Sequence, residues 1–206
     1  MKIFKTRNFL AEFLSKHQQE KILDLGCGNR KIAGAIGVDC IDYPVVDVAH
    51  NLNLFPYPFE GASFDAVVLN HVIEHLENIP NTLKEIHRLL KSEGEVWIAT
   101  PHFSDSHSWV DHTHRHHLSI RSFINFCHPP YYWFDMDFAY ITLKGRWKGI
   151  GYERLINRRK QGVNEVSRRV ERWEDKHCFV RRGGEMYFIL RKVKNIKDQQ
   201  GMVLKY

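Results

Sequence analysis

The sequence predicts an α/β protein: a mainly parallel sheet of about seven strands, with helices on both faces as a three-layer sandwich and an antiparallel C-terminal strand. Two observations support this prediction. Short, continuously apolar segments alternate with segments of helical spacing, which is typical of parallel strands buried on both faces. The first of these strands also ends directly in a glycine-containing loop. We therefore expect strands and helices to alternate along the chain.

The expected elements of the N-terminal half follow one another at short intervals. Apolar side chains recur at helical spacing over residues 3–17, so the first 19 residues should form an amphipathic helix. Pro80 lies near the start of a second helix and Gly94 follows its end. The expected strands are Lys21–Leu25, Ala35–Asp39, Val45–Val48, Phe64–Leu69 and Glu95–Thr100, and the helix before the last of them is Asn81–Leu90.

The pattern changes after Pro101. Residues 102–117 are rich in His, Ser and Asp and show no periodicity. A short helix is expected at Ser119–Phe126, strands at 136–144 and 185–193, and a charged helical insertion at 160–178. A Gly-Gly pair precedes the last strand as a turn signal.

Length and composition favour one domain over residues 1–206, since 206 residues with 43% hydrophobic side chains can bury a full core. No apolar run has the length of a membrane span. The start is basic, and the segment after it is interrupted by Glu12 and Lys16, unlike the apolar part of a secretory signal. Four scattered cysteines form no CxxC pair. These features favour a cytoplasmic protein and leave its oligomeric state open.

Charge is distributed unevenly along the chain. Residues 1–143 hold 12 Lys/Arg and 17 Asp/Glu, a balance of −5, and residues 144–206 hold 18 and 7, a balance of +11. The basic part suits an anionic partner such as a phosphate, an acidic glycan, a lipid headgroup or RNA. A solvated basic surface explains it equally well.

The loop after the first strand is the main functional signal. Glycines in Asp24-Leu25-Gly26-Cys27-Gly28 let the backbone approach a ligand closely. Ligands of open parallel sheets bind outside the carboxyl ends of the strands. Asp39 ends the second strand, where a carboxylate can accept two hydrogen bonds from a ribose diol.

At this point the sequence resembles the class I S-adenosylmethionine-dependent methyltransferases. The resemblance covers residues 20–101: Ile22–Gly28 matches the glycine-rich motif, Asp39 the ribose acid, Asn51-Leu52 the adenine-contacting segment and Phe64–Leu76 the strand-four motif of the small-molecule subgroup. It implies a Rossmann-like fold, S-adenosylmethionine as cofactor and S-adenosylhomocysteine as product. The expected cofactor-binding residues are Asp24, Gly26, Cys27, Gly28, Asp39, Asn51, Leu52 and Asn70, with Asn70 and His71 bordering the sulfonium methyl.

Two departures from the family's pattern concern the loop. Arg30 replaces its third glycine, and only Cys27–Gly34 separates the first two strands, so the usual helix is reduced to a turn. A non-catalytic subunit with the same fold therefore stays an alternative. A nicotinamide-binding protein is disfavoured, because Lys31 stands where GxGxxG needs glycine and Asp39 follows too soon.

The histidine-rich segment begins at the carboxyl end of the fifth strand, and residues 102–130 are expected as an insertion on the acceptor side. One interpretation is acid–base work, since a neutral imidazole can take the acceptor's proton. The candidates for this role are His102, Asp111 and His114, where Asp111 would orient an imidazole. His71, nearer the expected methyl, is a further catalytic candidate that would help to present the acceptor. A purely structural role is the alternative for each histidine.

A metal site is the other interpretation of this segment, although no metal is expected overall. His112, His114 and His116 would share one face of an extended strand, and His is a ligand of Zn, Fe or Ni. No HExxH or Cys pairing accompanies them.

The function predicted from these features is methyl transfer from S-adenosylmethionine to an O or N atom of a small-molecule or glycan acceptor, including an anionic one, by in-line displacement. An RNA methyltransferase is the alternative. The basic C-terminal part favours it, and Asn70-His71-Val72-Ile73 in place of an Asn/Asp-Pro-Pro-aromatic motif disfavours it.

Overall fold

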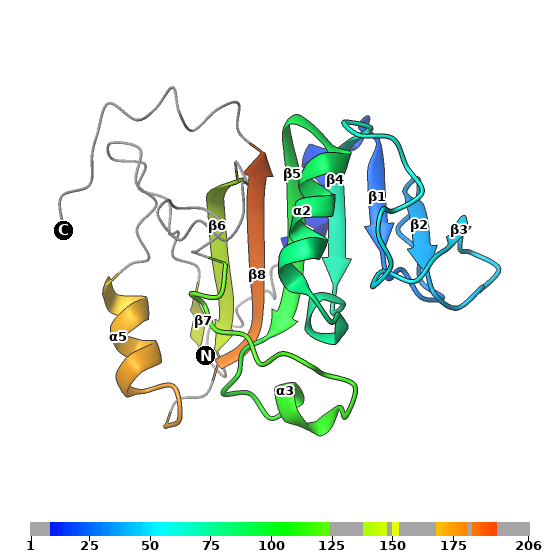
Figure 1. Ribbon diagram of the computed structural model, residues 1–206. Coiled ribbons are helices and arrows are strands. Elements are labelled where there is room, and N and C mark those ends of the chain that lie inside the picture. Colours follow the sequence, from blue (N-terminus) through cyan, green and yellow to red (C-terminus); the bar gives the residue numbers. More distant parts are fainter. Residues whose placement is uncertain (1–8, 124–137, 148–149, 153–167, 181–182, 193–206) are drawn as a thin grey trace.

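A computed structural model describes residues 9–123, 138–147, 150–152, 168–180 and 183–192. Within them lies an eight-stranded sheet of order β3-β2-β1-β4-β5-β8-β6-β7 (Figure 1). It has one strand more than the predicted seven, because β7 forms a hairpin with β6 at the edge. The strands are β1 Ile22–Leu25, β2 Ile36–Asp39, β3 Val48–Ala49, β4 Phe64–Asn70, β5 Leu90–Pro101, β6 Phe138–Trp147, β7 Ile150–Tyr152 and β8 Gly183–Lys192. The helices are α1 Phe9–Lys16, the 3-10 turn η1 Ile73–His75, α2 Ile79–Leu89, α3 His107–Val110 and α5 Arg168–Lys176.

Strand direction follows the prediction. Strands β1 to β5 pair in parallel. Strand β8 is antiparallel to both β5 and β6. The mainly parallel sheet with an antiparallel C-terminal strand is therefore confirmed.

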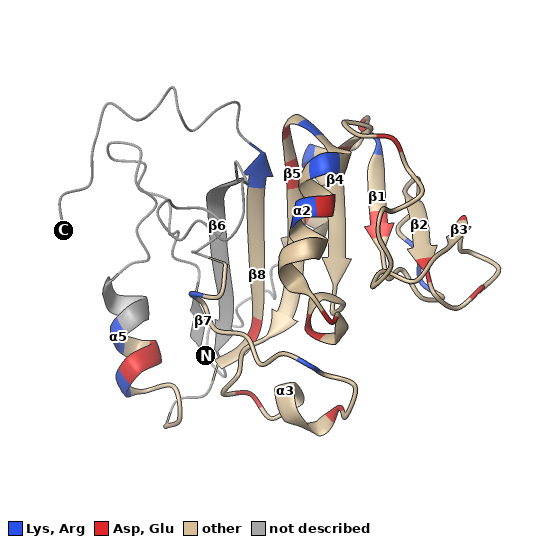
Figure 2. Ribbon diagram, in the orientation of Figure 1, with Lys and Arg blue, Asp and Glu red and all other residues tan. Residues whose placement is uncertain are grey.

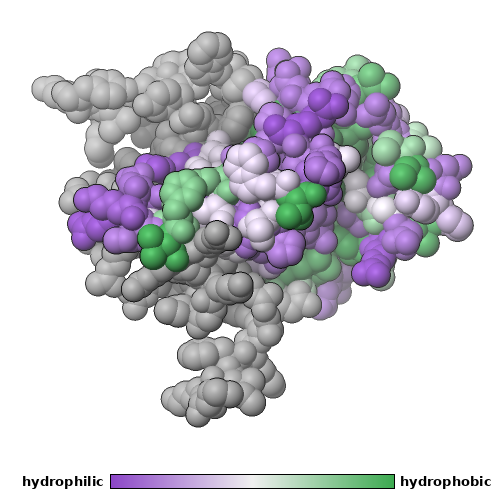
Figure 3. Space-filling model, turned by 90° about the horizontal axis from the view of Figure 1, so that it is seen from below, coloured by the Kyte–Doolittle hydropathy of each residue, from purple (hydrophilic) through white to green (hydrophobic). Residues whose placement is uncertain are grey.

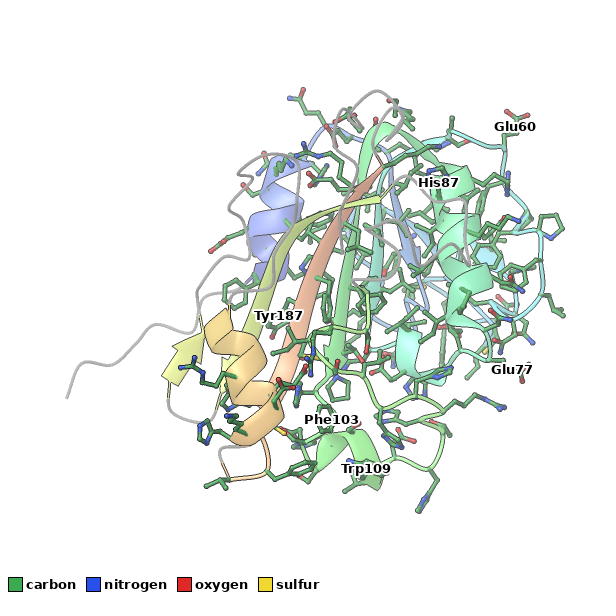
Figure 4. The ribbon with its side chains drawn as sticks, turned by 60° about the vertical axis from the view of Figure 1, so that its left-hand side comes forward. Glu60, Glu77, His87, Phe103, Trp109 and Tyr187 are labelled. Carbon is green, nitrogen blue, oxygen red and sulfur yellow. The ribbon has the colours of Figure 1, made fainter. Side chains whose placement is uncertain are left out.

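Two helices cover opposite faces of the sheet, as Figure 4 shows for α1 and α2. Helix α2 buries Leu83, Ile86 and Leu89 in a core cluster that includes alternate residues of β1, β4, β5 and β8. The other residues of the same strands, with Trp97 the largest, pack with Phe13 of α1. Because successive strand side chains face opposite ways, one strand serves both cores.

The third strand differs from its prediction. It was expected at Val45–Val48 and is Val48–Ala49. The Asp47 carboxylate accepts a hydrogen bond from the Gly37 amide at 2.7 Å and pairs with the Lys31 ammonium at 2.7 Å. A turn precedes Asp47, in which the Tyr43 carbonyl accepts a hydrogen bond from the Val46 amide at 2.9 Å, and it leaves a very short strand.

Helix α2 begins two residues earlier than expected. The Asn78 side chain caps it by accepting a hydrogen bond from the Asn81 amide at 2.9 Å, and Pro80 occupies its first turn. Residues 27–35 between β1 and β2 form turns, so the predicted loss of a helix there is confirmed.

The described ranges cover the predicted insertions only in part. The N-terminal helix is described from Phe9, the 102–130 segment up to residue 123 and the 160–178 insertion from residue 168. Of the helix expected at Ser119–Phe126, residues 120–123 form a turn and the rest lies outside the described residues. No helix in these ranges is both long and apolar enough to cross a bilayer.

Candidate functional site

The predicted site residues lie at the edge of the sheet where β1, β2, β4 and β5 end, at the bottom of Figure 1. Acidic residues occupy the ends of β1 and β2 (Figure 2). The segment 102–123, with α3, folds across the same edge, and Phe103 and Trp109 mark it in Figure 4. Seen from below, the described part of this face is mostly hydrophilic with scattered apolar side chains (Figure 3). Parallel sheets bind their ligands at this edge.

The two loop glycines have different surroundings. Gly26 and Gly28 have φ angles of 69° and 54°, in the left-handed region that favours glycine. A Cβ atom on Gly26 would lie 2.4 Å from Val72 Cγ2, whereas one on Gly28 would meet no described atom within 4 Å beyond its chain neighbours. Gly26 is therefore required by packing, and Gly28 borders open space.

Asp39 is bonded to the loop from the end of β2. Its Oδ2 accepts a hydrogen bond from the Gly28 amide at 2.8 Å and its Oδ1 accepts one from the Ile41 amide at 2.9 Å. Each oxygen keeps a second lone pair for a ligand hydroxyl. The half-buried Asp39 carboxylate thus lies next to the open space at Gly28.

Two buried groups lie behind the loop. Asp24 is 4% exposed and accepts a hydrogen bond from the Ile32 amide at 2.8 Å. Burial raises the pKa of Asp24 to about 6, so a neighbouring cation would stabilise its ionised form. Burial also raises the pKa of Cys27 to about 11, so its thiol stays neutral and serves as a packing group.

The predicted adenine segment has one exposed and one buried residue. Asn51 is exposed, and its side-chain oxygen accepts a hydrogen bond from the Asn53 amide at 3.0 Å. Leu52 is buried, and its carbonyl accepts a hydrogen bond from the Tyr57 hydroxyl at 2.9 Å. Leu52 offers an apolar wall, and the Asn51 amide remains accessible.

His71 follows Asn70 at the end of β4 and lies between two carboxylates. Its Nε2 is hydrogen-bonded to Glu185, which also accepts a hydrogen bond from the Tyr187 hydroxyl. Its Nδ1 is 3.3 Å from Glu74 Oε1. The hydrogen bond with Glu185 and the nearby Glu74 carboxylate raise the pKa of His71 to about 9. At neutral pH the ring is a cation, so it suits presenting the acceptor rather than taking its proton.

His102 is 1% exposed and fully engaged. Its Nδ1 accepts a hydrogen bond from the Ser104 amide at 3.2 Å, and its Nε2 lies 3.1 Å from Glu174 Oε1. A Cβ on Gly183 would lie 2.6 Å from the His102 ring, so the ring is tightly covered. In this arrangement His102 has no ring nitrogen free for an acceptor and acts as a link between β5 and α5.

The next part of the segment gathers around Asp111. The exposed Asp111 accepts hydrogen bonds from the Thr113 hydroxyl at 2.6 Å and the Thr113 amide at 2.8 Å, and the hydroxyl hydrogen bond lowers the pKa of Asp111. Its Oδ2 is 3.9 Å from His114 Nε2. Asp111, expected to orient an imidazole, therefore makes only a loose contact with His114. His75 and His114 instead lie edge to face, with ring centroids 4.6 Å apart.

The metal candidates His112, His114 and His116 are not brought together. Residues 112–113 form a turn and 114–117 no strand, so the alternation expected for an extended chain does not arise. In the described ranges, the potential metal ligands that meet within 4.8 Å are Glu74, His75 and His114. Of the three histidines named from the sequence, only His114 belongs to this group.

Several residues of this edge were not anticipated. Glu185 and Tyr187 lie on β8, 114 or more residues beyond His71, so only the fold shows that they meet. Glu74 and His75 were part of the strand-four motif, where an acid beside a histidine could have signalled a ligand pair.

The comparisons with known proteins agree with this architecture. A family model described as a methyltransferase domain matches residues 2–132. Solved structures share the fold at low identity. A putative methyltransferase from Bacillus halodurans C-125 is 15% identical, with a TM-score of 0.60, over 91% of this chain and 100% of its own. A SAM-dependent methyltransferase from Archaeoglobus fulgidus is 17% identical, with a TM-score of 0.57, over 89% of this chain and 91% of its own.

A third structure is a complex between the Haloferax volcanii Trm112 methyltransferase activator and a putative methyltransferase. It is 15% identical, with a TM-score of 0.51, over 90% of this chain and 89% of the other. No curated protein matches the chain. Since the family model covers more than half of the sequence and the glycine loop, Asp39 and the sheet follow the expected order, the chain belongs to the methyltransferase-domain family, of the class I type that uses S-adenosylmethionine.

Proposed function

We propose that this methyltransferase transfers a methyl group to an O or N atom of a small-molecule or glycan acceptor. The observation that supports a small acceptor is the way the segment 102–118 closes over the carboxyl edge. The Phe103 amide donates to the Leu118 carbonyl at 2.8 Å, and the Arg115 and His116 amides donate to the Glu74 carbonyl at 2.8 and 3.1 Å. These bonds join the two ends of the segment and hold one of them beside η1, which follows β4. In this proposal the segment narrows the approach to the methyl group, which suits one protruding reactive group.

The residues around the glycine loop fit the cofactor. The open space at Gly28 admits a ligand close to the backbone, and Asp39 beside it has lone pairs for a ribose diol. The buried Asp24 gains a counter-charge if the ligand's ammonium group approaches it. In this proposal Gly26, Cys27 and Leu52 shape the pocket, Asn51 accepts from the adenine amino group and Asn70 borders the methyl.

S-adenosylmethionine supplies a methyl group already activated on a sulfonium, so the chain's own contribution is alignment and exclusion of water. His71 and Glu185 are the titratable pair next to Asn70. We assign them to positioning the acceptor, with the His71 cation held by the carboxylate.

Cofactor binding is tested first, by isothermal titration with S-adenosylmethionine and S-adenosylhomocysteine. Asp39→Ala removes a charged hydrogen-bond acceptor, worth about 1.5–3 kcal/mol or roughly 10- to 150-fold in Kd. Asp42→Ala, an exposed acid three residues further on, is the matched control and should bind normally. Absence of binding by the unchanged protein at high micromolar ligand would refute an active enzyme and favour a non-catalytic subunit.

The acceptor class is tested by incubating the protein with methyl-labelled S-adenosylmethionine and a fractionated cell extract. Label in the small-molecule or glycan fraction supports the proposal. Label in an RNA fraction, together with RNA binding that weakens steeply with salt, would replace it with the RNA methyltransferase alternative.

A further inference from the structure

Three potential metal ligands converge beside the donor edge, the edge of the sheet where β1, β2, β4 and β5 end. Glu74 and His75 belong to η1, and His114 lies in the segment after α3. One ligand atom from each lies within 4.8 Å of the others, and no other group of three or more such residues gathers in the described part of the chain. The Arg115 and His116 amides both donate to the Glu74 carbonyl, so the backbone fixes His114 next to η1.

The Glu74 carboxylate independently points to a cation ligand. Its side chain is fully buried, at 0% exposed, and among the described residues neither oxygen accepts a hydrogen bond. His71 Nδ1, at 3.3 Å from Oε1, is its one ion-pair contact there, and it leaves Oε2 without a partner. A buried carboxylate oxygen without a partner is costly, and carboxylates in such places are paired or coordinate metals.

Hydrogen bonds orient both imidazoles for coordination. The Thr113 hydroxyl donates to Asp111 at 2.6 Å, so its oxygen accepts from His75 Nδ1 at 2.9 Å. His114 Nδ1 donates to the Ser108 carbonyl at 3.1 Å. Both rings are therefore held in the tautomer whose Nε2 carries the free lone pair. Metal-binding histidines are fixed in this way by the bond their other nitrogen makes.

We propose that Glu74, His75 and His114 bind one divalent transition-metal ion of the Zn²⁺ class. Two imidazole nitrogens and one carboxylate oxygen are a donor set of zinc sites that keep an open coordination position, and of other first-row ions. Mg²⁺ and Ca²⁺ prefer oxygen ligands and suit the set poorly. The site differs from the one predicted from His112, His114 and His116.

The position of the site suggests what the ion would do, and this step rests on the proposed function. Glu74 contacts His71, which borders the donor edge, and His114 belongs to the segment that covers the acceptor side. An open coordination position between them would suit an acceptor oxygen, whose proton a bound cation makes easier to lose. Metal binding itself does not depend on that step.

The experiment measures metal binding without cofactor or acceptor. Full-length protein is prepared without a histidine tag, stripped with EDTA and dialysed, then titrated with ZnCl₂ by calorimetry and with CoCl₂ by visible absorption. We expect one equivalent of Zn²⁺, a ligand-field spectrum for Co²⁺ and no comparable binding of MgCl₂. A metal that binds the native state should also raise the melting temperature.

Variants separate ligands from bystanders. His114→Ala and Glu74→Gln should each weaken Zn²⁺ by more than the ~10- to 100-fold typical of losing a ligand's hydrogen-bond partner, and Thr113→Val should fall in that range. His112→Ala, an exposed histidine of the same segment, is the matched control and should bind normally. Circular dichroism of the metal-free variants shows whether each is folded.

Binding below one equivalent in the unchanged protein would overturn the proposal, as would equal losses in His114→Ala and His112→Ala. If Zn²⁺ binds as expected but S-adenosylmethionine does not, the metal site stands and the proposed methyl transfer fails. If S-adenosylmethionine binds and Zn²⁺ does not, the reverse holds.

Discussion

Substituting alanine for Gly26 or for Gly28 in the donor loop, the loop after β1, should produce two different defects. Gly28→Ala places a methyl group in open space, at φ 54°, whereas Gly26→Ala places one 2.4 Å from Val72 Cγ2, at φ 69°. The left-handed conformation costs an L-residue about 1–2 kcal/mol at either position. Only Gly26→Ala adds an overlap in the core, which costs typically about 1–3 kcal/mol.

The expected loss in the free energy of unfolding is therefore about 1–2 kcal/mol for Gly28→Ala and about 2–5 kcal/mol for Gly26→Ala. Urea denaturation measures both values. For cofactor binding, Gly28→Ala should be the variant with the specific defect. Gly28→Ala remains folded, but its methyl group occupies the space proposed for the ligand, so titration calorimetry should detect little S-adenosylmethionine binding.

A third variant tests the cause of the Gly26→Ala defect. Val72→Ala alone leaves a cavity, but in combination with Gly26→Ala it removes the atoms that overlap. The double variant should then be more stable than the sum of the two single effects predicts. Equal stability of Gly26→Ala and Gly28→Ala would refute the packing argument, and normal cofactor binding by Gly28→Ala would refute the position of the ligand.

Three further predictions concern buried groups. Burial alone would raise the pKa of Glu95, but hydrogen bonds from His17, Lys16 and Arg191 lower it from 4.5 to about 2. The stability that the ionised Glu95 contributes is present above pH 4.5 and is lost as the pH falls toward 2, so the urea midpoint of unfolding should fall over this range. Glu95→Gln should make the urea midpoint less dependent on pH. Asp24 has its pKa raised from 3.8 to about 6, so S-adenosylmethionine affinity should rise between pH 5 and 7 as this carboxyl ionises; a constant Kd, or an Asp24→Asn variant with the same profile, would contradict its proposed role. Gly183→Ala would place a Cβ 2.6 Å from the buried His102 ring and should destabilise the protein by about 1–3 kcal/mol in thermal unfolding, and an unchanged melting temperature would show that β8 can shift.

Local sequence predicted the part of the molecule that local residues determine. Continuous apolar segments mark β1, β2, β4 and β5, because strands buried on both faces need no alternation. The donor loop was also predictable from nearby residues. Gly26, Gly28 and Asp39 lie within 14 residues, and the parallel pairing of β1 with β2 brings them together.

The acceptor side depends on contacts between distant segments. His102 looked like a catalytic histidine by position, but its Nε2 meets Glu174, 72 residues further along the chain. His71 was a catalytic candidate because it borders the expected methyl, and its hydrogen bond to Glu185 on β8 makes its ring a cation. In both cases a carboxylate far away in the sequence decides whether the imidazole can accept a proton. No spacing in the sequence indicates which carboxylate will contact the ring.

One backbone feature joins the donor edge to the proposed metal site. His71 has φ 57°, a conformation that costs a non-glycine residue about 1–3 kcal/mol and persists only where its surroundings fix it. Its amide donates to the Ala99 carbonyl at 3.0 Å, and its ring lies between Glu185 and Glu74. The strained turn thus brings β4, which ends at the donor edge, directly into η1, which carries two of the three ligands. A substitution at His71 would disturb both sites at once, so the two functions can be separated only away from this turn, by Asp39→Ala for the donor and His114→Ala for the ion.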